Sequence, residues 1–144
     1  MVWNPGVCNI LSVVMDAEEA MVEKYALVMA GTAVNQVKLT TGANVQCEGV
    51  IQNTVSVLQL AAGGGKKKVD VMMIGITKVI RSASACARAA YAIAEGADGH
   101  VKAGAFTGTP DIQHVVGRML STPDTDGDYG YMLLNVHDIY MPAS

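Results

Sequence analysis

The chain has 144 residues, which is the size of a single domain, and a formal net charge of −3. Hydrophobic residues make up 51% of it and charged residues only 16%, whereas about 25% charged is usual. This composition excludes a disordered chain, and the acidic charge argues against a nucleic-acid-binding protein that relies on phosphate neutralisation. With so little polar surface, part of the apolar surface is expected to face another subunit, so we expect an oligomer.

The first fifteen residues carry no charged side chain and are predicted to form an extended N-terminal arm. Asn4-Pro5-Gly6 disfavours a helix there, and the following Val, Ile and Leu residues favour an extended chain. We expect the arm to contact a neighbouring molecule through its apolar side chains; the alternative is a mobile or locally packed terminus. The expected contact residues are Trp3, Val7, Ile10, Leu11, Val13 and Val14.

Residues 16–24 are predicted to form a short acidic helix. Asp16 is a suitable N-cap, and Glu19 stands three residues later, as in a capping box. A helix of this length is marginal alone, so tertiary contacts would have to hold it. Arm and helix together give an N-terminal unit of residues 1–24.

From Tyr25 to the end of the chain, short β-rich runs alternate with turn residues, which predicts a β-rich domain over residues 25–144. Runs are expected at 25–30, 36–40, 49–60, 67–81, 91–94, 100–102, 114–120 and 129–136. Gly75 interrupts one of them, which suits a bulge or a close backbone approach. The fold class expected is mainly β, a small barrel-like or sandwich-like domain with a short N-terminal helix.

The chemistry-bearing patterns in the chain are all incomplete. The run Gly63 to Lys68 lacks the first glycine and the Ser or Thr of a phosphate-binding loop, which leaves an exposed tip where Lys66, Lys67 and Lys68 could make an electrostatic contact. The acids at 124–128 do not follow the order of a calcium loop.

The three cysteines, Cys8, Cys47 and Cys86, form no C-x-x-C pair and are expected to be reduced. His100, His114 and His137 show no metal-ligand spacing, and no G-x-S-x-G motif is present. We therefore expect no enzyme, no catalytic residue, no cofactor and no metal site. The N-terminus lacks the pattern of a signal peptide, and no apolar run is long enough for a membrane span, so synthesis in the cytoplasm without membrane contact is expected.

The order of the β-rich runs across residues 25–136 resembles the tailed-phage capsid cement, or head decoration, proteins. The segments that carry the resemblance are the strand from Tyr25, the run at 48–53, the ribbon at 71–79, the turn and strand at 96–101, and the strands at 116–120 and 131–135. The resemblance implies a structural virion protein that binds the major capsid protein on the outside of an assembled shell. It also implies a homotrimer that clamps neighbouring capsomers, and no nucleic-acid partner.

Two other classes of protein stay open at this point. One is a ligand-binding barrel, although the scarcity of aromatic residues counts against a ligand cavity. The other is a generic trimeric structural module unrelated to capsids.

Overall fold

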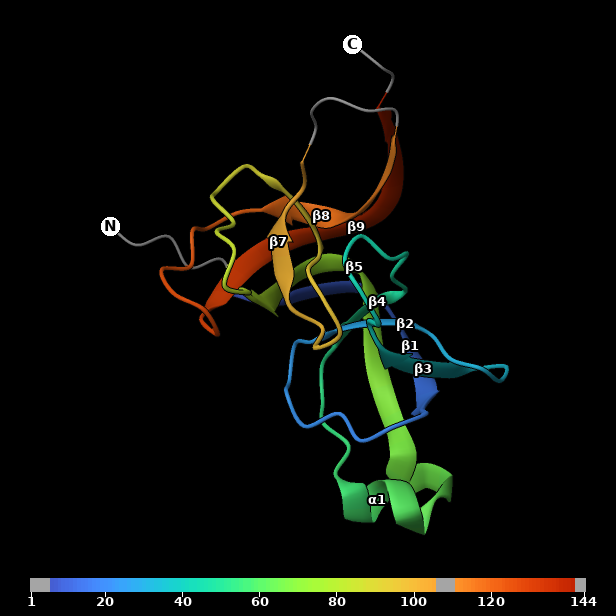
Figure 1. Ribbon diagram of the computed structural model, residues 1–144. Helices are drawn as coiled ribbons and strands as arrows, with labels where there is room; N and C mark the ends of the chain where they lie inside the picture. The colour runs from blue at the N-terminus through green and yellow to red at the C-terminus, as the bar shows by residue number, and fades with distance from the viewer. Residues whose placement is uncertain (1–5, 106–110, 142–144) are drawn as a thin grey trace.

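The computed structural model describes residues 6–105 and 111–141, and within these residues β-strands predominate (Figure 1). The strands are β1 (Cys8–Ala17), β2 (Leu27–Ala30), β3 (Gln36–Leu39), β4 (Gly49–Ile51), β5 (Lys68–Ile80), β6 (Tyr91–Ala94), β7 (Val101–Ala103), β8 (Asp111–Met119) and β9 (Tyr129–Met141). A short helix α1 (Val57–Ala62) and a 3-10 turn η1 (Gly64–Lys67) lie between β4 and β5. The mainly β fold class expected from the sequence is confirmed.

All of the strands belong to one sheet of order β1-β3-β2-β4-β5-β9-β8-β6-β7. β1 also pairs with β5 in an antiparallel ladder, so β1, β3, β2, β4 and β5 form a ring. On the other side, a bridge between Arg81 and Val101 brings β7 back beside the end of β5. The sheet therefore curls into two barrel-like halves that share β5, and neither half is evenly closed.

Each half has its own apolar cluster. The cluster within the ring contains Ala17, Met21, Ala26, Val28, Val37, Ile51, Val55, Val69, Val71 and Ile80. The cluster beneath β9, β8 and β6 contains Leu27, Cys47, Val50, Met72, Val79, Cys86, Ala92, Ala94, Val101, Val116, Met119, Met132 and Leu134. The chain thus buries its small aliphatic side chains in two places, one on each side of β5.

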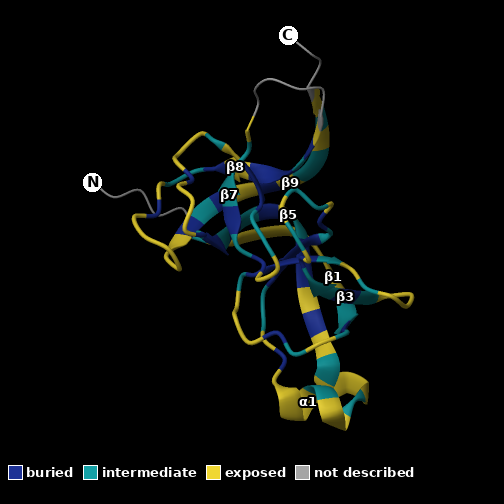
Figure 2. Cartoon of the chain, in the orientation of Figure 1, coloured by how far each residue is buried: buried dark blue, intermediate teal, exposed yellow. Residues whose placement is uncertain are grey.

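β5 contributes side chains to both clusters, since Val71 belongs to the ring cluster and the adjacent Met72 to the other. Exposed and buried residues alternate from Lys68 to Val71 (Figure 2), which places Val71 in the ring cluster. Beyond Gly75, which has a φ of 145°, it is Val79 that faces the other cluster and Ile80 that faces the ring. A Cβ at position 75 would collide with the carbonyl oxygen of Cys8, so the expected close backbone approach at this glycine is confirmed.

The predicted helix at residues 16–24 is wrong. Asp16 and Ala17 end β1, where they pair with Gln36 and Val37 of β3, and the following residues form bends and a single bridge from Met21 to Val55. The carboxylate of Asp16 does not cap a helix but lies 2.6 Å from the ammonium of Lys68. Sheet pairing and burial of Ala17 and Met21 outweigh a weak local helix signal.

The short helix lies instead at 57–62, where a continued strand was expected. Ser56 caps it, with its hydroxyl accepting from the Gln59 N–H and the Gln59 side chain accepting from the Ser56 N–H. None of its six residues is buried. The helix is therefore held by its cap and by Leu60, which packs partly against the ring cluster.

Candidate interaction surface

The N-terminal segment is extended as expected, but it is a strand of the sheet. β1 pairs with β5 from Cys8 opposite Ile76 to Asp16 opposite Lys68, so one edge of its backbone is already satisfied. Along its other edge, pairing with β3 is confined to Asp16 and Ala17, and no described strand lies beside residues 8–15. That edge presents backbone donors and acceptors to which another chain could add a strand.

The expected contact residues of this segment remain on the surface. Trp3 lies outside the described residues. The other five have relative exposures from 39% at Val13 to 68% at Ile10: Val7, Ile10, Leu11, Val13 and Val14. They do not share one side of the strand, because Val14 is opposite exposed Asp70 whereas Val13 is opposite buried Val71.

A further apolar surface, which was not predicted from the sequence, lies on β5 and β9. Between β5 and β9 the register runs without a break from Ile74 opposite Asn135 to Ile80 opposite Tyr129. Alternate residues of β9, Met132 and Leu134, enter the core, so their neighbours face outward. We call this surface the outer face; its residues are Ile74, Ile76, Lys78, Tyr129, Tyr131, Leu133 and Asn135, with Arg118 of β8, Tyr91 of β6, and Cys8 and Leu11 of β1.

Two features of the outer face suit contact with a protein. It combines Tyr, Arg, Leu and Ile, which is the composition of the energetically important part of many interfaces. Its large side chains are also partly in solvent, with Leu133 43% and Tyr129 54% exposed. None of its residues is Asp or Glu, although the chain as a whole is acidic.

At one end of the outer face, three tyrosine rings surround a lysine. The Lys78 ammonium lies 5.8 Å from the ring centroids of Tyr25 and Tyr131 and 5.9 Å from that of Tyr129. The rings of Tyr25 and Tyr129 meet edge to face at 5.6 Å. These contacts hold a positive charge and two aromatic edges in a fixed arrangement.

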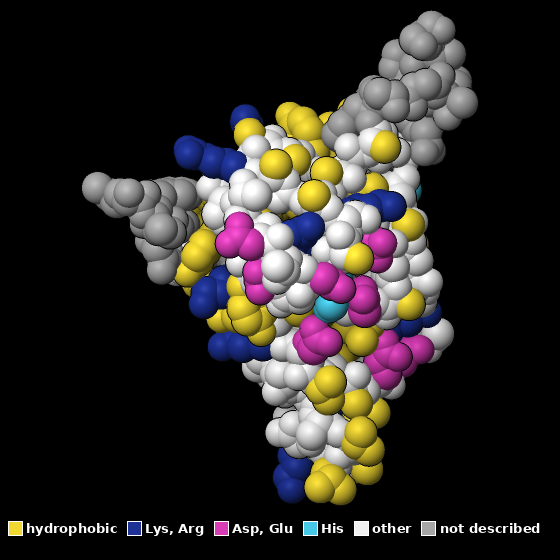
Figure 3. Space-filling model, turned by 60° about the vertical axis from the view of Figure 1, so that its left-hand side comes forward, with side chains coloured by type: hydrophobic (Ala, Val, Ile, Leu, Met, Phe, Trp, Pro, Cys, Tyr) yellow, Lys and Arg dark blue, Asp and Glu magenta, His cyan; other side chains and the backbone are white. Residues whose placement is uncertain are grey.

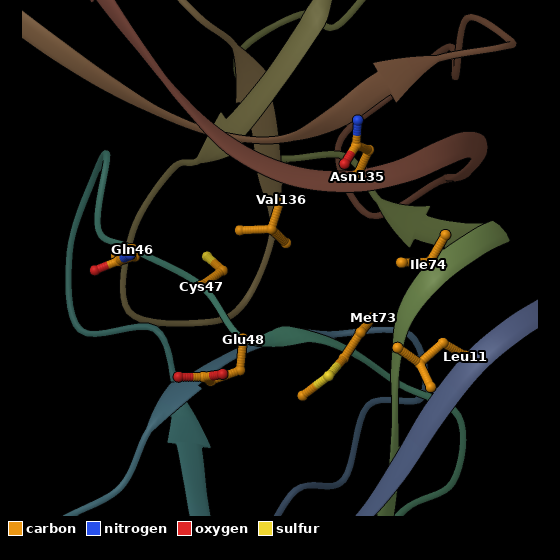
Figure 4. A pocket seen from close by; sticks show the side chains of 8 residues that line it. All are labelled: Leu11, Gln46, Cys47, Glu48, Met73, Ile74, Asn135 and Val136. Atoms are coloured by element: carbon orange, nitrogen blue, oxygen red, sulfur yellow. The ribbon is translucent and has the colours of Figure 1, made fainter.

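At the other end, an open groove of about 370 Å³ lies among β1, β5, β9 and the loop before β4 (Figure 4). Leu11, Met73 and Ile74 line one side of it, and Cys47, Glu48 and Val136 lie across from them. Burial raises the pKa of the Cys47 thiol to about 12, so this sulfur is a poor nucleophile and acts as a packed apolar group. The groove offers shape and apolar surface, and no reactive group.

The three candidate lysines lie where η1 meets β5. Lys68 opens β5 and pairs with Asp16, whereas Lys66 and Lys67 belong to η1. They lie beside α1, at the end of the molecule opposite β8 and β9 (Figure 1), where Leu58 is 82% exposed. They are therefore separate from the outer face.

Two of the three histidines, His100 and His114, lie beside carboxylates, and two of these carboxylates come from segments distant in the sequence. His100 Nε2 lies 3.0 Å from Glu23 and its Nδ1 lies 3.3 Å from Asp98, while His114 Nδ1 lies 2.7 Å from Asp138 across the β8–β9 ladder. Acidic side chains surround a histidine in the middle of the face that Figure 3 shows. In the described part of the chain, no group of three or more His, Cys, Asp or Glu side chains could hold a metal ion.

No protein-family model matches the chain, and no curated protein matches its sequence. Among residues 6–105 and 111–141, no helix is long and apolar enough to cross a bilayer.

Proposed function

We propose that this chain is a structural, non-enzymatic protein that binds the outer surface of an assembled phage capsid. In this proposal it acts as a homotrimer, contacts the major capsid protein and stabilises the shell by clamping neighbouring capsomers. It would be made in the host cytoplasm and reside on the virion surface, with no nucleic-acid or membrane partner. The sequence pattern of residues 25–136 supports the capsid assignment through its resemblance to head decoration proteins.

The observation that carries an interaction role is the exposed outer face. A monomer does not usually leave Ile74, Leu133 and Tyr129 together on one side of a sheet unless a partner covers them. Complete burial of a Leu, Ile or Phe side chain contributes about 1.5–3 kcal/mol before ordering costs. Several such side chains can supply the affinity, and three copies of the face in a trimer add avidity.

β1 supplies a second mode of attachment beside the outer face. Its free edge over residues 8–15 can accept a strand, and Ile10 and Leu11 flank that edge with exposed apolar side chains. Because these contacts are apolar and backbone-mediated, binding should depend only modestly on salt.

Co-sedimentation with expanded, undecorated capsids tests this proposal, with light scattering of the free protein to measure its oligomeric state. We expect Leu133→Asp and Ile10→Asp to reduce binding strongly. Val34→Asp is the matched control. Val34 is 88% exposed in the turn between β2 and β3, so this substitution adds the same charge away from both proposed contact surfaces. Equal binding by all three variants, or no sedimentation of the natural chain with capsids, would refute the proposal.

A further inference from the structure

A second groove, of about 300 Å³, opens at the margin of the outer face. Its lining residues are Arg88, Ala89, Arg118, Met119, Leu120 and Leu133. Arg118 of β8 lies directly opposite Leu133 of β9 in the ladder and opposite Tyr91 of β6. The groove thus joins two guanidinium groups to the apolar part of the outer face.

The two guanidinium groups have no carboxylate partner among the described residues. Arg118 uses its Nε–H to donate to the carbonyl oxygen of Ala89 at 3.3 Å, which fixes the side chain at the groove and leaves its terminal nitrogens available. The backbone N–H of Arg88 donates to Thr122 Oγ1 at 2.8 Å, which anchors the loop that carries the other arginine. No acidic residue lines the groove.

Guanidinium groups bind both carboxylates and phosphates through paired N–H donors, so the two arginines alone do not distinguish these anions. The other residues of the groove and the charge of the chain do. Met119, Leu120 and Leu133 provide an aliphatic lining, which suits an aliphatic side chain next to the anion better than a hydrophilic sugar–phosphate backbone. The net charge of −3 also opposes the approach of a polyanion such as DNA. Both observations favour a protein carboxylate.

We propose that this groove binds an acidic side chain flanked by aliphatic residues on a partner protein. The carboxylate pairs with Arg88 and Arg118 while the neighbouring aliphatic side chain packs on Leu133. This inference rests on the proposed function, since it takes the outer face to be an interface, and it adds the chemistry of the partner surface.

The test uses the full chain, isotopically labelled, and two blocked tripeptides, acetyl-Leu-Glu-Leu-amide and acetyl-Leu-Gln-Leu-amide, in NMR titrations. We expect the Glu peptide to bind at least about fivefold more tightly than the Gln peptide, because a charge-assisted pair is lost in the latter. The shifted resonances should include those of Ala89, Arg118 and Leu133. The double variant Arg88→Gln/Arg118→Gln should bind both peptides equally.

The matched control is Lys66→Gln/Lys67→Gln, which removes the same charge at η1 and should retain the preference for Glu. Inorganic phosphate should compete less well than the Glu peptide. The inference is overturned if phosphate competes equally, if both peptides bind alike, or if neither shifts any resonance at about 10 mM. Because no capsid is used, these outcomes are independent of co-sedimentation, which tests the proposed function.

Discussion

Replacing Gly75 by alanine should separate the N-terminal half of β1 from β5 and destabilise the fold. The added Cβ meets two difficulties at once: a backbone φ of 145° that L-residues rarely adopt, and a collision with the carbonyl oxygen of Cys8. Strained backbone regions cost about 1–3 kcal/mol, and forcing an extra carbon into a packed site costs typically about 1–3 kcal/mol more. The free energy of unfolding should therefore fall by about 2–6 kcal/mol.

Two other glycines separate these contributions. Gly127 has a φ of 85° and no atom within 4 Å of the position that a Cβ would occupy, so Gly127→Ala should lose only the backbone contribution, about 1–2 kcal/mol. Gly96 has neither problem, and Gly96→Ala should be neutral or stabilise by about 0.4–1 kcal/mol through the unfolded state. The predicted order of stability, from highest to lowest, is Gly96→Ala, natural chain, Gly127→Ala, Gly75→Ala.

Urea unfolding measures the three free energies, and amide hydrogen exchange locates the damage. In Gly75→Ala, exchange should accelerate most for β1 and its partners in β5, since the collision lies between these strands. Equal stability of Gly75→Ala and Gly127→Ala, with β1 amides still protected, would show that the close approach of β1 to β5 does not require a glycine.

Three further predictions concern the core, the thiols and the pairing of β1 with β5. Leu134→Ala should lower the free energy of unfolding by about 2–5 kcal/mol, whereas Leu133→Ala, its exposed neighbour, should change it by about 0.5 kcal/mol or less; similar losses in urea unfolding would contradict the assignment of the outer face. In the native protein Cys8 should react with a thiol reagent first, because it is exposed. Burial protects Cys47 and Cys86 and raises the pKa values of their thiols to about 12 and about 11. Simultaneous labelling of all three cysteines would count against the fold. The Lys68 ammonium beside Asp16 lowers the pKa of that carboxyl below its usual 3.8, so the pair stabilises the fold at neutral pH and loses its effect as pH falls through the folded-state pKa. The stability difference between the natural chain and Lys68→Gln should accordingly vanish in acid, and a difference that is unchanged at low pH would refute the pairing.

Local sequence signals predicted the turns and strands that neighbouring residues specify. The turn at 95–99 lies between β6 and β7 as expected, because Asp98-Gly99 allows the positive φ of 79° that Gly99 adopts. The long turn at 122–128 connects β8 to β9, and the mainly β class follows from the density of such turns.

The N-terminal third shows where local signals fail. Acidic residues after Asp16 resemble a helix start, but Asp16 instead meets Lys68, which lies far along the chain, and Glu23 meets His100. Such partners are fixed by strand register and cannot be read from spacing along the chain. The helix at 57–62 was not predicted because its local signal is weak: one capping box starts a helix of only six residues.

The chain's own composition determined a β-rich, apolar protein with surplus hydrophobic surface, and it marked the exposed N-terminal residues. The tertiary structure alone decided which surface is free. In β9 both alternating sets of side chains, Tyr131 and Leu133 on one side and Met132 and Leu134 on the other, are apolar, so periodicity cannot tell the buried side from the exposed one. The register against β5 and β8 makes that choice, because it turns Met132 and Leu134 toward the core and leaves Leu133 beside Arg118 in solvent.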